Sequence, residues 1–364
     1  MAVAPARPPS AVAVGRATPS SSPSRPPESF SHPGSRAIAT SPRTVDVPSL
    51  VAHAREGRSR AVARLISLVE DGHPALPEVM AALAPHAGHA HVVGLTGSPG
   101  VGKSTTTAAL ISALRASDQR VAVLAVDPSS PFSGGALLGD RIRMEHHATD
   151  PGVFIRSVAS RGHLGGLSFA TPQALRVLDA AGFDVILVET VGVGQSEVEV
   201  AARADTTVVI VAPGMGDGIQ AAKAGILEIG DVFVVNKADR DGADDTVRDL
   251  RHMIQLGNRE RSVDWRTPVV RTVASRGDGI PELVDSLVAH RDWLAESGEL
   301  RARRRRRAEA EIEAIALAEL RRRLGAEGGL VPGDLSSAVA SGETDVYAAA
   351  GQVVERVTGG SSRE

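Results

Sequence analysis

Short apolar runs alternate with segments of helical periodicity through the middle of the chain. The apolar runs predict strands at His91–Thr96, Val121–Val126, Val153–Val158, Val185–Glu189, Thr206–Val211, Asp231–Val235 and Pro268–Val273. Several are unbroken runs of Val, Ile and Leu, as expected for parallel strands that helices cover on both faces. Predicted helices begin near Lys103, Phe169, Ser196, Gly218 and Ala243, and another follows Pro281. Residues 91–292 are therefore predicted to form an α/β domain with a doubly wound, mostly parallel sheet.

Residues 45–90 show helical spacing without a strand signal. Their apolar positions between Leu50 and Val69 recur at helical intervals, and Gly57 interrupts the pattern. We expect one helix to end near Gly57 and a second to follow it. With another helix predicted at Leu76–Leu83, these residues form an N-terminal helical extension.

Residues 293–364 also lack a strand signal. A long helix is predicted at Glu299–Leu324 and a further one at Asp345–Val357. A helical arm of this kind must bury its apolar stripe, and the simplest partner is a second copy of the chain. We therefore expect a homodimer formed through a C-terminal arm. The stripe consists of Ile312, Ile315, Ala316, Leu320 and Leu324.

Residues 1–44 are rich in Pro, Ser, Ala and Arg, and Glu28 is their only acidic residue. Such a segment buries too little apolar surface to fold, so we expect a disordered tail. Its composition also resembles an organellar transit peptide, although the prolines oppose the amphipathic helix that such peptides form. We expect a cytoplasmic protein, or a protein of the mitochondrial matrix if the tail is a transit peptide.

Overall composition excludes several kinds of protein. The sequence contains no cysteine, which excludes disulfides, thiolate zinc sites and cysteine nucleophiles. The formal net charge is −3, so no global charge favours a nucleic-acid or membrane partner. No apolar run reaches the roughly 18 residues of a membrane span. We expect neither nucleic acid nor a membrane as a partner.

Two clusters of basic residues suggest binding sites but have simpler interpretations. His86, His89 and His91 could ligate a metal, but spacing alone is weak evidence and no cysteine or nearby carboxylate accompanies them. The run Arg301–Arg307 could contact nucleic acid. Acidic residues follow it, beginning at Glu309, which favours a solvated helix face.

The segment from Gly97 to Ser104 matches the P-loop motif G-x-x-x-x-G-K-[ST], between a predicted strand and a predicted helix. Backbone amides and the helix N-terminus can surround a phosphate group. Lys103 can reach the β- and γ-phosphates, and the Ser104 hydroxyl can ligate Mg²⁺. We therefore predict a nucleoside triphosphate site. The expected contacts are Gly97, Ser98, Pro99, Gly100, Val101, Gly102, Lys103, Ser104 and Thr105.

The end of a later strand, Asn236-Lys237-Ala238-Asp239, matches the guanine-reading motif N-K-x-D. The carboxylate of Asp239 can accept hydrogen bonds from N1–H and the amino group of guanine, and adenine lacks both donors. Asn236 is expected to brace the loop, and Lys237 to lie along the base. The motif predicts GTP and GDP as ligands.

Carboxylates follow two other predicted strands. Glu189 ends a Walker B strand, and Glu189–Gly192 forms E-x-x-G where many GTPases have D-x-x-G. Glu189 is expected to hold a Mg²⁺-bound water, and the Gly192 amide to contact the γ-phosphate as part of a switch loop. Asp127 lies at the carboxyl edge, where ligands of such sheets bind, and is a candidate metal or catalytic residue; the alternative is a Pro-Ser-Ser turn without such a role. Asp140, in the following loop, is the second candidate.

These motifs together resemble one family, the MeaB/ArgK GTPases that chaperone cobalamin-dependent acyl-CoA mutases. The resemblance extends from Ser49 to Arg323, and Glu-Thr-Val-Gly-Val-Gly-Gln-Ser-Glu at Glu189–Glu197 is highly specific. The other segments that carry it are Gly97–Thr105, Val126–Ser130, Gly134–Met144, Pro213–Gln220 and Asn236–Asp239.

The resemblance implies how the site is completed. The loop beside the base would be Val273-Ala274-Ser275. The family tends to have Ser-Ala at the first two positions of this loop. Val273 in place of that serine removes one side-chain contact of this loop. The loop Gly214–Lys223 would be an additional switch that faces the mutase. The residues around Mg²⁺ would be Ser104, Asp127, Asp140 and Glu189.

The resemblance also implies a role. The client would be methylmalonyl-CoA mutase or a related acyl-CoA mutase. GTP binding and hydrolysis to GDP and phosphate would gate adenosylcobalamin loading and protect the mutase from inactivation. A homodimer with a C-terminal dimerisation arm is implied as well.

Hydrolysis requires charge neutralisation and an oriented water molecule. Mg²⁺, Lys103 and the P-loop amides would neutralise charge on the phosphates while water attacks in line. Gln195 is a candidate for orienting the water, and a group supplied by the partner is the alternative. The candidate catalytic residues are Lys103, Glu189, Gly192 and Gln195.

Three other functions fit parts of the sequence. A nickel-delivery GTPase of hydrogenase or urease maturation is supported by the histidine cluster and opposed by the absence of cysteine. A kinase of a transport system would need a phospho-acceptor pocket or catalytic-loop signature, and the sequence shows neither. The third is a nucleotide-dependent scaffold that does not hydrolyse GTP.

Overall fold

The computed structural model describes residues 45–128, 147, 149–160, 170–190, 202–214, 226–258, 264–325, 331 and 333–359. The chain divides into two units, Met1–Thr44 and Val45–Glu364, and every described residue belongs to the second. The predicted tail, and the helices predicted to begin near Ser196 and Gly218, lie outside the described residues.

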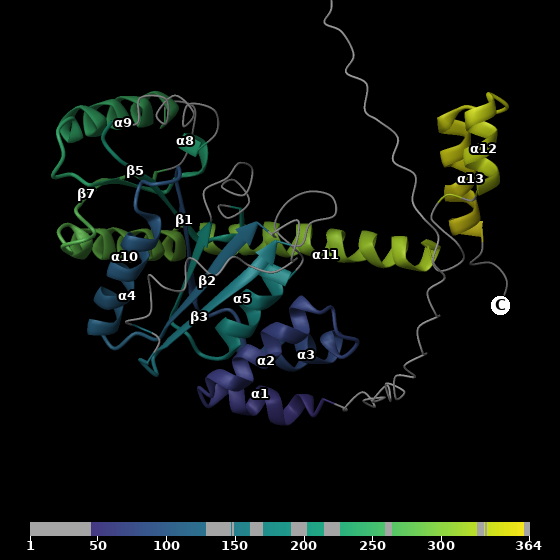
Figure 1. Ribbon diagram of the computed structural model, residues 1–364, viewed down its shortest axis with the longest axis horizontal. Helices are drawn as coiled ribbons and strands as arrows, with labels where there is room; N and C mark the ends of the chain where they lie inside the picture. Colours follow the sequence, from purple (N-terminus) through teal and green to yellow (C-terminus); the bar gives the residue numbers. More distant parts are fainter. Residues whose placement is uncertain are drawn as a thin grey trace, which may run out of the picture. The chain divides into compact units, whose positions relative to one another are not determined.

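Seven strands form one sheet in the order β3-β2-β4-β1-β5-β6-β7, and each neighbouring pair is parallel (Figure 1). This confirms the predicted doubly wound α/β fold. β1, β5 and β6 are buried along their whole length, which explains their unbroken apolar runs. The strands are β1 His91–Thr96, β2 Val121–Pro128, β3 Val153–Ser160, β4 Val185–Thr190, β5 Thr206–Val211, β6 Val232–Asn236 and β7 Val269–Thr272.

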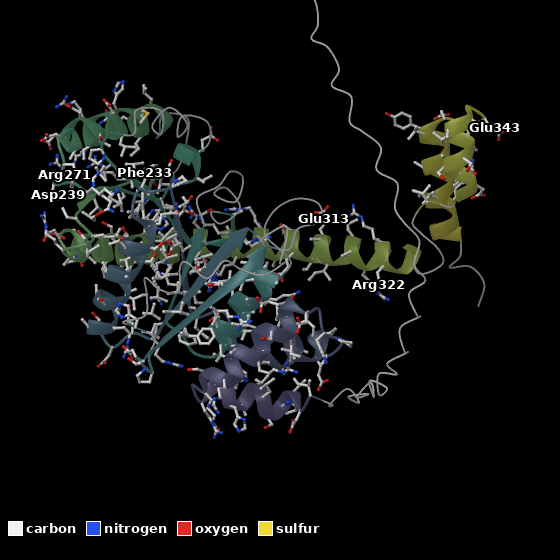
Figure 2. All side chains as sticks on the ribbon, in the orientation of Figure 1. Phe233, Asp239, Arg271, Glu313, Arg322 and Glu343 are labelled. Carbon is white, nitrogen blue, oxygen red and sulfur yellow. The ribbon has the colours of Figure 1, made fainter. Side chains whose placement is uncertain are left out.

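Helices cover both faces of the sheet. Val92 packs with residues of the N-terminal helices and α5, whereas its neighbour Val93 packs with residues of α4 and α10. Phe233 of β6 is buried between the sheet and α9 (Figure 2). The helices of this domain are α4 Lys103–Ala116, α5 Ala170–Ala180, α8 Ile226–Ile229, α9 Ala243–Asn258 and α10 Ile280–Glu296.

The N-terminal extension contains the predicted helices and the predicted break. Gly57 separates α1 from α2 with φ +82°, a conformation that residues with a side chain rarely adopt. The Asp46 side chain accepts a 3.1 Å hydrogen bond from the Ser49 amide and so caps α1. Leu65 and Ile66 of α2 are fully buried in the core shared with α5. The elements are α1 Val47–Arg55, α2 Ser59–Glu70, α3 Leu76–Leu83 and the 3₁₀ turn η1 Ala84–His86.

In the described part of the chain beyond α10, the helices are α11 Glu299–Gly325, α12 Gly333–Ser341 and α13 Val346–Gly359. The first and third agree with the predicted helices, whereas α12 was not predicted. Its residues are mostly small, and Leu335 is its one buried residue, so its sequence carries little apolar periodicity. Among the described residues, no helix has both the length and the apolar character needed to cross a membrane.

The arginine run at the start of α11 is not simply a solvated face, and that expectation was wrong for three of its members. Arg303 bonds to both carboxylate oxygens of Asp231, at 2.9 and 3.0 Å. Arg304 bonds to Asp205 at 2.8 Å, and Arg307 also pairs with Asp205. These five residues are called the arginine–aspartate cluster below. Arg301, Arg305 and Arg306 are exposed, as expected.

The arginine–aspartate cluster attaches α11 to the amino-terminal edge of the sheet. Asp205, which precedes β5, also accepts the amide of Val92 in β1 at 3.1 Å. Asp231, which precedes β6, accepts the amide of Thr207 in β5 at 2.8 Å. Burial opposes ionisation of Asp205, but the bond from Arg304 and the charges of Arg307 and Arg304 outweigh it, so the pKa of Asp205 lies below its ordinary value. The attachment of α11 to the sheet could not be predicted from the sequence, because Arg304 and Asp205 are 99 residues apart.

Candidate nucleotide site

The predicted P-loop connects β1 to α4 at the carboxyl edge of the sheet. Gly97 and Gly102 have φ values of +140° and +100°. A Cβ atom at Gly97 would lie 2.1 Å from the carbonyl oxygen of Ile210, and one at Gly102 would lie 2.3 Å from Nδ2 of Asn236. Both positions therefore require glycine, and the loop packs directly against β5 and the N-K-x-D motif.

Lys103 begins α4 and is only 8% exposed. Its Nζ donates hydrogen bonds to the carbonyl oxygens of Gly97 at 2.6 Å and Ser98 at 3.2 Å. The ammonium group is thus held against the loop that is shaped for an anion. In this position its charge can pair with the terminal phosphates of a nucleotide.

Glu189, near the end of β4, lies beside the P-loop serine. Its side chain is 4% exposed, and Oε1 accepts a hydrogen bond from Ser104 Oγ at 2.6 Å. Oε2 accepts one from Thr107 Oγ1 at 2.9 Å. The structure therefore brings two predicted site residues together and adds Thr107, which the sequence did not single out. Thr107 lies three residues after Ser104, a spacing that places both on one helix face and could have indicated it.

Asn236 connects the P-loop to the loop after β7. Its Nδ2 donates to the carbonyl oxygen of Val101 at 2.8 Å. Its Oδ1 accepts from Thr272 Oγ1 and from the amide of Ala274, both at 3.1 Å. Asn236 is buried, so these three bonds satisfy an amide that would otherwise be costly to bury. The bracing role expected for Asn236 thus has a geometric basis.

Lys237 and Asp239 lie on the open side of the same loop. Lys237 has φ +57°, and its Nζ donates to the carbonyl oxygen of Gly100 at 2.6 Å. The Asp239 side chain is 41% exposed and lies 3.6 Å from Nη1 of Arg276. Its carboxylate is therefore accessible to the edge of a base. Arg276, whose Nε donates to Asp278 at 2.9 Å, was not predicted.

The predicted base loop Val273-Ala274-Ser275 follows β7 directly. Val273 and Ala274 are buried, whereas Ser275 is exposed. The Val273 amide donates to the carbonyl oxygen of Asp278 at 2.9 Å, which closes the loop. Gly279 allows this turn, because a Cβ atom there would lie 1.9 Å from the Arg271 carbonyl oxygen.

Other predicted site residues cannot be placed with their side chains. Asp127 lies in β2, where its backbone pairs with Ala159, but its side chain is outside the described part of the structure. Asp140, Gly192 and Gln195 also lie outside the described residues, and so do most residues of the predicted switch Gly214–Lys223.

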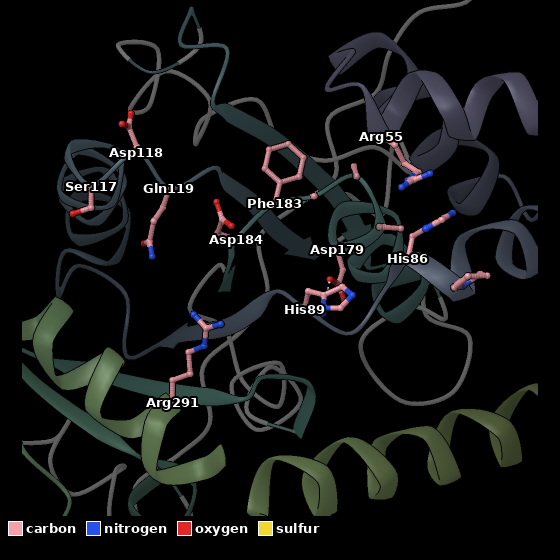
Figure 3. A pocket seen from close by; sticks show the side chains of 14 residues that line it. Arg55, His86, His89, Ser117, Asp118, Gln119, Asp179, Phe183, Asp184 and Arg291 are labelled. Atoms are coloured by element: carbon pink, nitrogen blue, oxygen red, sulfur yellow. Dashed lines mark hydrogen bonds between the residues drawn. The ribbon is translucent and has the colours of Figure 1, made fainter. Parts of the chain in front are cut away.

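The histidines lie near the opposite, amino-terminal edge of the sheet. His86 and His89 line a cavity of about 590 Å³ (Figure 3). His91 instead is buried, with its Nε2 2.7 Å from Thr206 Oγ1, and that hydroxyl lies 2.8 Å from Nδ1 of His290. Burial lowers the pKa of His91 and of His290 to about 4, so both are neutral at pH 7. In the part of the chain that is described, no three histidine or acidic side chains form a metal-binding group.

Fold and site together define the class of protein. A parallel sheet carries a P-loop after β1, a buried glutamate in β4 bonded to the P-loop serine, and an N-K-x-D motif after β6 that is bonded to the P-loop. This combination defines a P-loop GTPase.

Comparison with known proteins identifies the family. The family model described as Methylmalonyl Co-A mutase-associated GTPase MeaB matches residues 62–328. Because this match covers more than half of the chain, the chain belongs to the MeaB family. The predicted resemblance to MeaB/ArgK GTPases is thereby confirmed.

Individual relatives agree with this assignment. A protein of Pyrococcus horikoshii named as a GTPase is 46% identical over 314 residues, 86% of this chain and 99% of that protein. GTPase ArgK of Escherichia coli is 39% identical over 254 residues, 68% of this chain and 76% of that protein. The crystal structure of a LAO/AO transport system kinase superposes with a TM-score of 0.63 at 28% identity, over 86% of this chain and 97% of that one. The chain is a GTP-hydrolysing enzyme.

Proposed function

We propose that this GTPase is a chaperone of a cobalamin-dependent acyl-CoA mutase, either methylmalonyl-CoA mutase or a relative of it. The observation that carries the proposal is the match of residues 62–328 to a family described as methylmalonyl-CoA mutase-associated. GTP binding and hydrolysis would gate adenosylcobalamin loading and protect the mutase from inactivation. The experiment that tests it is retention of a purified mutase subunit by this protein loaded with GTP or with GDP.

In this proposal GTP lies across the carboxyl edge of the sheet. The P-loop residues Gly97–Thr105 would surround the phosphates, and Asp239 would accept hydrogen bonds from guanine. The exposed carboxylate of Asp239 and the bonds of Asn236 to both the P-loop and Ala274 support this arrangement. Binding of guanine would replace the contact between Asp239 and Arg276.

The described residues beside the P-loop suit Mg²⁺. The hydroxyl of Ser104 and the carboxylate of Glu189 supply the oxygen donors that Mg²⁺ prefers, and they lie 2.6 Å apart at a buried position. Ser104, Asp127, Asp140 and Glu189 would hold the ion. When bound, it would neutralise charge on the β- and γ-phosphates.

The chain's own residues would then position the reaction. Lys103 would stabilise the charge that develops on the β–γ bridging and γ-phosphate oxygens, and the P-loop amides would hold the phosphates in line with water. The Gly192 amide would contact the γ-phosphate and couple it to the switch loop. Gln195 would orient the attacking water.

We further propose that the chain forms a homodimer through its C-terminal arm, residues 293–364, beyond the GTPase domain at 91–292 and the extension at 45–90. The distal half of α11 supports this, because Ile312 is 67% exposed and Leu320 47% exposed. The arginine–aspartate cluster secures the proximal half of the helix, so the exposed apolar side chains of the distal half are held on a fixed support.

Replacing Ile312 and Leu320 together with glutamate is expected to convert the dimer to a monomer, because charges on the proposed interface must be desolvated without partners. Sedimentation equilibrium measures the change. Glu313→Gln, on the same helix (Figure 2), is the matched control and should leave the dimer intact. A dimer that persists in the double variant would place the interface elsewhere.

A further inference from the structure

The hydroxyl group of Thr107 holds one half of the Glu189 carboxylate. Thr107 is fully buried in α4, and its Oγ1 lies 2.9 Å from Oε2 of Glu189. Ser104, about one helical turn earlier, donates to the other oxygen at 2.6 Å. Each oxygen of a nearly buried carboxylate therefore has its own hydroxyl donor from the same helix.

The same hydroxyl has a second possible acceptor. Oγ1 of Thr107 lies 3.1 Å from the carbonyl oxygen of Lys103, the usual partner of a threonine within a helix. A hydroxyl has one proton, and the Glu189 oxygen is both nearer and charged. Hydrogen bonds to ionised acceptors are roughly twice as strong as neutral ones, so Glu189 is the preferred acceptor.

We infer that Thr107 is a positioning residue for the Mg²⁺ site: it fixes the orientation of the Glu189 carboxylate and thereby sets the affinity of the nucleotide complex for Mg²⁺. The inference rests on the Mg²⁺ site of the proposed function. Glutamate has one more rotatable bond than the aspartate found here in many GTPases, and fixing it costs more side-chain entropy. The bond from Thr107 adds to the bond from Ser104 and so restricts the rotation of this longer side chain.

The test measures release of a fluorescent GDP analogue at increasing Mg²⁺ concentrations. Thr107→Val is expected to raise the half-saturating Mg²⁺ concentration by about tenfold or more, as is typical when a group that orients a metal ligand is lost. Affinity for the analogue in EDTA should not change, because within the described residues the Thr107 hydroxyl bonds to Glu189 and to the backbone oxygen of Lys103, and not to a side chain proposed to bind the nucleotide. Thr107→Ser keeps the hydroxyl and should restore the wild-type Mg²⁺ dependence.

Two further variants separate positioning from packing. Thr106 is also fully buried in α4, and its Oγ1 donates to the carbonyl oxygen of Gly102 at 3.0 Å. Thr106→Val is therefore the matched control and should leave the Mg²⁺ dependence unchanged. In a Glu189→Gln background, adding Thr107→Val should cause no further shift, because Thr107 acts through that carboxylate.

Wild-type Mg²⁺ dependence in Thr107→Val would overturn the inference, and so would an equal shift in Thr106→Val. If release from the wild-type protein does not respond to Mg²⁺ at all, the proposed Mg²⁺ site is itself wrong. If Thr107→Val fails to fold, comparing Thr107→Ala with Thr107→Ser tests the same hydroxyl. Equal behaviour of those two variants would overturn the inference as well.

Discussion

Lys103→Ala is expected to lower the rate of GTP hydrolysis by at least about 10²–10³-fold, the loss typical when one positioned donor to transition-state charge is removed. The Lys103 ammonium is buried and bonded to the carbonyl oxygens of Gly97 and Ser98, inside the loop that would hold the phosphates. Protection of the mutase is expected to be lost with turnover. Phosphate release from purified protein measures the first effect, and mutase activity over time measures the second.

The control for this variant is Ser112→Ala on the same helix. Ser112 is exposed, and its Oγ bonds to the carbonyl oxygen of Ala108. It should hydrolyse GTP at the wild-type rate. Unchanged turnover in Lys103→Ala would contradict the assignment of the P-loop as the reaction site. Mutase protection that survived the loss of GTP binding would contradict nucleotide gating.

Asp205→Asn is expected to lower the free energy of unfolding by about 3–5 kcal/mol, the usual cost of breaking a buried ion pair on one side. Asp205 has no exposed surface, and its carboxylate accepts hydrogen bonds from Arg304, Arg307 and the Val92 amide. A neutral amide removes the carboxylate with which both guanidinium groups pair and points an N–H group toward other donors. Equilibrium unfolding in urea measures the loss.

Glu309→Gln is the matched control, because it removes an ion pair at the surface of the same helix. Arg305 and Glu309 lie 3.5 Å apart with side chains 76% and 65% exposed. Pairs so accessible to solvent contribute little, and the urea midpoint should barely move. If Asp205→Asn were as stable as this control, the arginine–aspartate cluster would not be what attaches α11 to the sheet.

The sheet could be predicted from local sequence almost completely. Each of the seven strands lies within a residue or two of its predicted range, because burial on both faces produces unbroken apolar runs. The core of the site was equally accessible to prediction. Lys103, Ser104 and Asn236 are found where the P-loop and N-K-x-D motifs place them, since both motifs are defined by a strand end and the loop after it.

What could not be predicted depends on contacts between distant parts of the chain. Thr107 and Glu189 are 82 residues apart, and the spacing of Thr107 from Ser104 is the one local signal that connects Thr107 to the site. The arginine–aspartate cluster likewise joins residues that are far apart in the sequence. The local pattern of charges on α11 favoured a solvated helix face instead. α12 was missed for a different reason, because small residues give a weak periodic signal.

If this GTPase is a mutase chaperone, the affinity of an acyl-CoA mutase for it depends on whether GTP or GDP is bound. The most direct measurement immobilises the protein loaded with a non-hydrolysable GTP analogue or with GDP. The amount of purified methylmalonyl-CoA mutase, or of a related acyl-CoA mutase, that each form retains is then compared. Asp239→Ala is the variant impaired in guanine binding. Retention of a mutase subunit is expected to differ between the two nucleotides, and this difference should be lost in Asp239→Ala. Retention of no mutase subunit, or equal retention with both nucleotides, would contradict the proposed chaperone function.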